Sequence, residues 1–192
     1  MNISIKLRRN SRARKILETA ALGAGILIIS TISPMGGASL VKRLIKQYFY
    51  KKSFQRRKFL DDLKNLQARE LVDYREMENG NIKITLTKNG RDKLLVYKLE
   101  DMKLKRPAKW NGKWRLVMFD IPHGYKRARD AFRQKLKRLE FYPIQKSVFI
   151  TPYPCEDEID FLASVFDIRK HVILMNIADF EGEEKLKRHF RI

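Results

Sequence analysis

Apolar residues in the first half of the chain follow a helical period and then an alternating one. Pairs of apolar residues three and four apart predict an amphipathic helix over 39–50. A second helix is predicted over 54–69, with Phe59, Leu63 and Leu66 as its buried stripe. Alternating apolar residues on either side of a turn at 78–81 then predict a two-stranded hairpin, and a further helix is predicted over 88–102.

This order of elements is typical of a winged helix-turn-helix module, which we expect over residues 1–102. In such a module the helix after the turn enters the major groove of DNA, and the hairpin lies along the backbone. The helix over 54–69 has the basic outer face and apolar inner stripe that this role needs. The residues expected to contact bases or phosphates are Gln55, Arg56, Arg57, Lys58, Lys64 and, in the hairpin, Lys83.

The segment before these elements is apolar and allows two interpretations. Residues 20–32 are small or apolar apart from Ser30 and Thr31, and a basic stretch precedes them. One interpretation is a buried first helix over about 14–32. The other is a membrane anchor, although the apolar run is shorter than the ~20 residues that a membrane-spanning helix needs.

The second half alternates between strands and helices. This βαββαβ order predicts a ferredoxin-like domain over 114–192, joined to the first module by a basic linker over 103–113, so that the whole chain is of the α+β class. We expect its exposed sheet face and edge strands to favour a homodimer. Strands are predicted over 114–120, 141–145, 147–151 and 172–177, helices over 126–139 and 155–166, and a charged tail from Asp179.

Charge indicates the class of partner. The 192 residues include 42 Lys and Arg against 22 Asp and Glu, a net charge of +20, and residues 1–105 hold +14 of it. A folded chain this basic favours a polyanion, so we expect double-stranded DNA, or RNA, as its partner. In the helix over 126–139, Arg127 and Arg133 would extend the nucleic-acid contact. One cysteine and three scattered histidines exclude a disulfide framework and a Cys- or His-rich metal cage, and they fit a cytoplasmic location.

Two motifs in the second half resemble a known family. They are Trp114 to Pro122 (WRLVMFDIP) and Gln145 to Pro152 (QKSVFITP). Together they resemble the central domain of PaaX-type transcriptional repressors, which is itself similar to CRISPR-associated protein 2. The resemblance covers most of 110–180. It implies a regulator that binds DNA as a homodimer through an N-terminal winged helix-turn-helix domain.

The same resemblance implies a possible catalytic position. In the CRISPR-associated relatives, strand-end aspartates of two subunits face each other and have been assigned a metal-dependent nuclease role; Asp120 matches that position. One carboxylate from each subunit could hold Mg²⁺ or Mn²⁺ together with water and phosphate oxygens, and His123 could act as an acid or base. The alternative is that Asp120 only caps the turn after its strand.

The sequence therefore leaves three functional hypotheses. The first is a dimeric DNA-binding regulator of the PaaX type. The second is a nuclease that uses Asp120 and His123 with a divalent metal ion. The third is a basic protein tethered to a membrane through residues 20–32.

Overall fold

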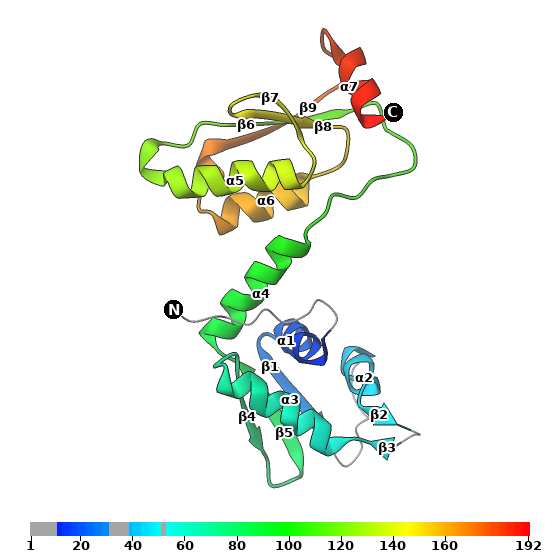
Figure 1. Cartoon of the computed structure of the whole chain (residues 1–192), viewed down its shortest axis with the longest axis vertical. Coiled ribbons are helices and arrows are strands. Elements are labelled where there is room, and N and C mark those ends of the chain that lie inside the picture. Colours follow the sequence, from blue (N-terminus) through cyan, green and yellow to red (C-terminus); the bar gives the residue numbers. More distant parts are fainter. Residues whose placement is uncertain (1–10, 31–38, 51–52) are drawn as a thin grey trace. The chain divides into compact units, whose positions relative to one another are not determined.

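The computed structural model describes residues 11–30, 39–50 and 53–192. The chain divides into two compact units, Met1–Glu100 and Asp101–Ile192, and each is described by itself (Figure 1). Both units combine helices with an antiparallel sheet, which confirms the predicted α+β class.

The first unit packs its helices against a small sheet. Strand β5 lies between β1 and β4 and pairs antiparallel with both. The core joins Ile16 and Leu17 of α1 to Phe59 and Leu63 of α3 and to Ile84 of β5. The elements in order are α1 (Arg12–Leu22), β1 (Ile26–Ser30), α2 (Ser39–Lys46), β2 (Phe49–Tyr50), β3 (Ser53–Phe54), α3 (Arg56–Ala68), β4 (Val72–Glu76), β5 (Asn81–Leu86) and α4 (Lys88–Asp101).

The expected single helix over 14–32 is wrong, because the helix ends at Leu22. Ala24 and Gly25 adopt positive φ angles of 56° and 86°, which no helix continues through. The apolar run that follows is instead the edge strand β1, in which Leu27 and Ile29 are buried while Ile26 and Ile28 are exposed. Residues 31–32 lie outside the described residues. Among those described, no helix is both long and apolar enough to cross a membrane.

The other elements of this unit follow their apolar patterns closely. Helix α2 stops at Lys46, short of the predicted 39–50. The last two residues of the predicted range form instead the short strand β2, which pairs with β3. Helix α3 and the β4–β5 hairpin occupy the predicted positions. A tight junction fixes α4 on this unit, because a Cβ atom on Gly90 would lie 2.0 Å from the Leu71 carbonyl oxygen.

The second unit is a four-stranded antiparallel sheet with strands in the order β7–β8–β6–β9. Helices α5 and α6 cover one face of it (Figure 1), where Phe119 stacks on Phe149 and meets the edge of Phe132. Its elements are β6 (Trp114–Phe119), a 3₁₀ turn (His123–Tyr125), α5 (Lys126–Arg138), β7 (Tyr142–Gln145), β8 (Val148–Thr151), α6 (Glu156–Val165), a second 3₁₀ turn (Arg169–His171), β9 (Val172–Ile177) and α7 (Glu183–Phe190).

The charged tail forms an additional helix, α7, that the apolar pattern did not predict. Its Leu186 packs with Trp114 and Ile150 on the sheet face opposite α5 and α6. The Trp114 ring also contacts Phe190 of α7, and its indole N–H donates to Glu183 Oε2 at 3.0 Å. Only one end of this second face is covered in this way, so the other end, around Ile173, stays open.

The segment that leads into β6 is held by one buried arginine. Arg115 is 5% exposed, and its Nη1 donates to the carbonyl oxygens of Lys113 and Pro152 at 2.7 and 3.2 Å and to Asn111 Oδ1 at 3.0 Å. Its Nε lies 3.5 Å from Glu156 Oε1. Because these acceptors satisfy the guanidinium, a buried charge is tolerated here.

Candidate nucleic-acid interface

Helix α3 presents charged side chains, most of them cationic, opposite its buried stripe. Phe59, Leu63 and Leu66 are fully or almost fully buried, as the pattern predicted. Arg57 and Lys64, seven residues apart, lie on the outer face. Asp61 lies between them in the same row, so this face is mixed in charge and not purely basic. The sites predicted on this helix are exposed with the exception of the half-buried Gln55 at its N-cap.

The first residues of α3 do not all face the same way. Arg57 and Lys58 are exposed to solvent, whereas Arg56 forms an ion pair with Glu76 at the end of β4. The amide side chain of Gln67 adds a second link to this strand by donating to Asp73 Oδ1 at 3.2 Å. Arg56 therefore ties α3 to the hairpin, and the two cations that follow it are the ones available to a ligand.

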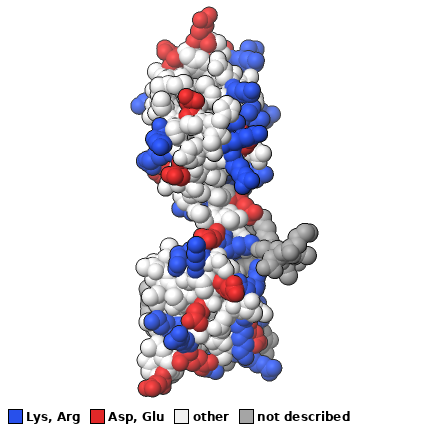
Figure 2. Space-filling view, turned by 90° about the vertical axis from the view of Figure 1, so that its left-hand side faces the viewer, with Lys and Arg blue, Asp and Glu red and all other residues white. Residues whose placement is uncertain are grey.

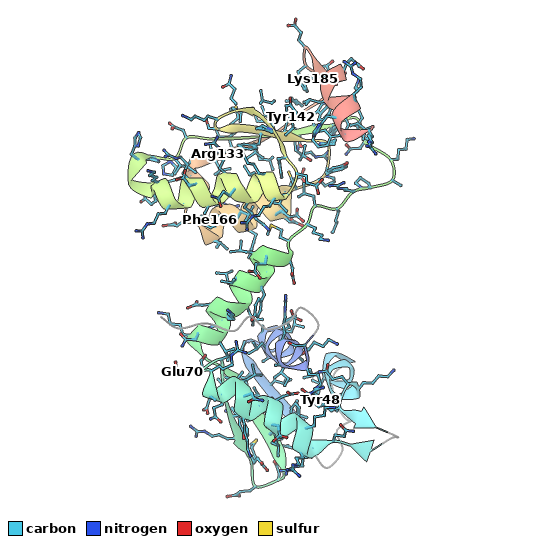
Figure 3. All side chains as sticks on the ribbon, viewed as in Figure 1. Tyr48, Glu70, Arg133, Tyr142, Phe166 and Lys185 are labelled. Carbon is cyan, nitrogen blue, oxygen red and sulfur yellow. The ribbon has the colours of Figure 1, made fainter. Side chains whose placement is uncertain are left out.

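A carboxylate on the inner flank of α3 fixes the helix on its unit. Asp62 Oδ2 accepts from the Tyr48 hydroxyl and from Arg12 Nε, both at 2.8 Å. Tyr48 (Figure 3) has a buried ring. Its ring meets the Phe59 ring edge-on, with 4.9 Å between the ring centres. Burial, and then the hydrogen bond to Asp62, raise the pKa of Tyr48 above its ordinary value. One oxygen thus links α1, Tyr48 between α2 and β2, and α3, and it holds the inner flank of α3 against its unit.

The hairpin residue Lys83 lies apart from the cations of α3. Lys83 pairs with Arg75 across β4–β5 and with Ile28 across β1–β5, so these three share the outer face of the sheet. Ile84, one residue later, belongs to the core that α3 joins. The predicted hairpin contact is therefore on the opposite face of the sheet from α3, and Arg75, which the sequence analysis did not select, stands beside it.

Helix α5 of the second unit exposes Arg127 but not Arg133. Arg133 is half-buried on α5 (Figure 3), and its Nε is a buried atom without a hydrogen-bond partner in the described part of the chain. Lys135 of the same helix is only 9% exposed. Figure 2 shows Lys and Arg side chains on both edges of this unit, with more of them on the right, and acidic side chains at its top. Of the two predicted contacts on α5, Arg127 alone is placed on the solvent side.

Asp120 follows the last residue of β6 and is exposed. Its backbone N–H donates to the carbonyl oxygen of His171 at 3.0 Å. Asp120 borders a shallow cavity of about 410 Å³, and Lys170 and His171 line it as well. Sequence reasoning missed these two residues, because they approach Asp120 only through the pairing of β6 with β9.

The predicted partner of Asp120 is not among the residues that line this cavity. His123 lies in the exposed 3₁₀ turn after β6 and does not border the cavity. In the described ranges, no group of three or more His, Cys, Asp or Glu side chains is placed to hold a metal ion. The site expected from the resemblance, with one aspartate from each of two subunits, would need a second copy of the chain.

Comparison with known proteins identifies the second unit. Residues 107–188 match the family model described as the PaaX protein central Cas2-like domain. This part of the chain is similar to the central domain of PaaX-type proteins. The match confirms the resemblance expected from the two motifs around β6 and β8. The matched residues include Asp120 and Arg127, whereas helix α3 lies outside them.

Whole-chain comparisons add little to this identification. No curated protein matches the chain. Among solved structures, an uncharacterized protein from Mycobacterium tuberculosis, Rv0674, is 17% identical, with a TM-score of 0.39, and the match covers 93% of this chain. The chain spans 66% of the length of that protein. A similarity of this size supports no argument about function.

Proposed function

We propose that this chain is a PaaX-like regulator that binds double-stranded DNA through its first unit. The order α1–β1–α2–β2–β3–α3–β4–β5, with a three-stranded sheet of β1, β5 and β4, supports a winged helix-turn-helix assignment for this unit. The strand order β7–β8–β6–β9, with α5 and α6 on one face, supports a ferredoxin-like assignment for the second unit.

The observation that carries the proposal is the cationic start of α3. Arg56, Arg57 and Lys58 occupy the first turn, where the helix dipole is positive, and no acidic residue accompanies them in that turn. Cations at this end cost about 0.3–1 kcal/mol each. A phosphate group would relieve this repulsion and would accept hydrogen bonds from the free N–H groups of the first turn. Because Arg56 is already paired with Glu76, this cost falls on Arg57 and Lys58, and a complex with a polyanion would relieve it.

Binding measurements test this proposal directly. In fluorescence anisotropy with labelled duplex DNA, the Arg57→Gln, Lys58→Gln double variant should bind at least ten-fold more weakly than the parent. Its salt dependence should also be shallower by about two counterions, one for each lost phosphate contact. Lys146→Gln, Lys185→Gln is the matched control, because it removes two exposed charges from the second unit. Equal affinity of the α3 variant and the parent for duplex DNA would refute the assignment. The same titration with labelled single-stranded RNA shows whether the protein prefers DNA or RNA.

A homodimer through the second unit is part of the same proposal. Beyond the end of the sheet that α7 covers, β6, β8 and β9 present Met118, Val148 and Ile173 on one face. Ile173, the second residue of β9, is 55% exposed, which is a high exposure for a large apolar side chain within a paired strand. In a two-fold symmetric dimer, this apolar face would be buried against the same face of a second copy. Light scattering should give a dimer for the parent and a monomer for Ile173→Glu; a parent that is monomeric at all concentrations contradicts the dimer.

Phosphodiester hydrolysis at Asp120 is the second candidate function. Its support is the position of Asp120 beside Lys170 and His171 at the rim of one cavity. Such a mixture of carboxylate, cation and imidazole could bind a phosphate and move a proton. The test is cleavage of labelled DNA and RNA in Mg²⁺ or Mn²⁺ by the parent, by Asp120→Asn and by His123→Asn. An equal cleavage rate in the parent and in Asp120→Asn would remove Asp120 from any catalytic role.

A further inference from the structure

The second unit contains a cavity that combines flat aromatic walls with cationic side chains. It is about 370 Å³ in volume, which is within the usual range for small-molecule sites. Trp110, Tyr153 and Phe190 supply its aromatic walls, and Arg106, Lys109 and Arg191 supply its charges. These residues come from the segment before β6, the end of β8 and the end of α7, so the fold and not the local sequence brings them together.

The aromatic walls are held in place before any ligand arrives. The indole N–H of Trp110 donates to the Lys113 carbonyl oxygen at 3.1 Å, and its ring lies 5.1 Å from that of the buried Trp114. The Tyr153 and Phe190 rings meet edge-on at 5.9 Å. Because their orientations are fixed by these contacts, a ligand would lose little free energy in ordering them.

The cations differ in how they are engaged. The Arg106 guanidinium lies 5.1 Å from the centre of the Tyr153 ring and forms an ion pair with Glu140, so it extends the flat surface and is already oriented. Lys109 and Arg191 are exposed at the same cavity. A guanidinium on an aromatic ring stacks well on a further aromatic ring, whereas exposed lysine and arginine side chains bind phosphate oxygens.

We propose that this cavity binds a nucleotide, with the base against the aromatic walls and the phosphate at Lys109 and Arg191. Base stacking on aromatic side chains combined with cationic groups for the backbone is the general chemistry of unpaired nucleotides. Three cations exclude a cationic ligand, and the aromatic walls give a plain inorganic anion no advantage over a nucleotide. The ligand could be a free mononucleotide or the unpaired end of a nucleic-acid strand. This inference is independent of DNA binding by α3.

Tryptophan fluorescence offers a direct assay, because both tryptophans of the chain, Trp110 and Trp114, are at or next to this cavity. With excitation at 295 nm, 5′-AMP should quench the full-length protein saturably. Adenosine, which lacks the phosphate, and ribose 5-phosphate, which lacks the base, should each bind at least ten-fold more weakly. A 5′-phosphorylated oligo(dA) of three nucleotides is the second arm: tighter binding than AMP identifies a strand end as the ligand, and equal binding identifies the free nucleotide.

Matched variants locate the binding site. Lys109→Gln should weaken AMP binding at least five-fold and leave adenosine binding unchanged. Lys113→Gln is the control, since Lys113 is exposed in the same segment but does not line the cavity. Arg57→Gln, Lys58→Gln in the first unit should bind AMP as the parent does, so failure of the DNA proposal is distinguishable from failure of this one. The inference is overturned if ribose 5-phosphate or inorganic phosphate binds as tightly as AMP, if AMP does not bind, or if Lys109→Gln and Lys113→Gln behave alike.

Discussion

Neutralising the start of α3 should make the first unit more stable while it weakens DNA binding. Arg57→Gln and Lys58→Gln each remove a positive charge that opposes the helix dipole, a gain of about 0.3–1 kcal/mol at low salt. Arg57 lies one turn before Asp61, and loss of this favourable spacing costs about 0.3 kcal/mol. The net expectation for the double variant is a gain of about 1 kcal/mol in the free energy of unfolding of the first unit.

The two units can be followed separately in one unfolding experiment. Both tryptophans lie in the second unit, so tryptophan fluorescence reports that unit alone, whereas far-ultraviolet circular dichroism reports both. For a domain of 60–100 residues, 1 kcal/mol raises the midpoint of thermal unfolding by about 4–8 °C. We expect this increase in the midpoint of the circular dichroism transition that belongs to the first unit. The fluorescence transition, which belongs to the second unit, should not change.

Salt and a second variant distinguish the proposed cause from a general effect of charge. The gain should largely disappear at about 1 M salt, where the screening length is about 3 Å. Lys64→Gln removes a cation of the same helix away from its first turn, so it should leave the midpoint nearly unchanged. If the double variant is no more stable than the parent at low salt, or if Lys64→Gln stabilises to the same extent, the argument from the helix dipole is refuted.

Three further predictions concern stability. Asp62→Ala should destabilise the first unit by about 2 kcal/mol, because it leaves the buried Tyr48 hydroxyl without its acceptor, and the neighbouring exposed Asp61→Ala should change little in the same urea titration. Gly90→Ala should lower the free energy of unfolding by about 3 kcal/mol or more, since its Cβ would collide with a backbone carbonyl. Gly124→Ala is the control, because a Cβ there meets nothing within 4 Å. Equal urea midpoints of the two variants would contradict the packing argument. Burial raises the pKa of the Cys155 thiol to about 12, so this thiol should resist a disulfide reagent at pH 8 in the folded protein and react only on unfolding. The stability that this shift contributes is complete below the ordinary pKa of 9.0 and is lost as pH rises toward 12. In urea titrations across this range, the free energy of unfolding should therefore fall more steeply with pH for the parent than for Cys155→Ala.

Most helices and strands could be predicted from the sequence, because their burial follows a simple period. Helix α3 and the β4–β5 hairpin are examples: each buries one regular face against a single core. The residues after Leu22 were predicted wrongly, since an apolar run of small and branched residues suits a buried helix and a strand equally well. The positive φ angles at Ala24 and Gly25 decide between the two, and they are a property of the turn rather than of the period.

The site residues were harder to predict than the elements. Exposure of Arg57, Lys58 and Lys64 followed from the helical period, but the tie between Arg56 and Glu76 depends on a contact twenty residues away in sequence. Lys170 and His171 reach Asp120 only through strand pairing, and the nucleotide cavity combines three segments that are distant in the chain. Contacts of this kind leave no local pattern, so they were missed.

Arg115 sets a practical limit on how the second unit can be produced by itself. Two of the oxygen atoms that satisfy its guanidinium belong to Asn111 and Lys113, ahead of the first strand. A truncated gene that begins at Trp114 keeps every strand of the sheet, yet it would leave the buried Arg115 with only the Pro152 carbonyl and Glu156 as acceptors. An expression plasmid that begins before Asn111 keeps both acceptors, and starting at Arg106 preserves the cavity for ligand screening as well.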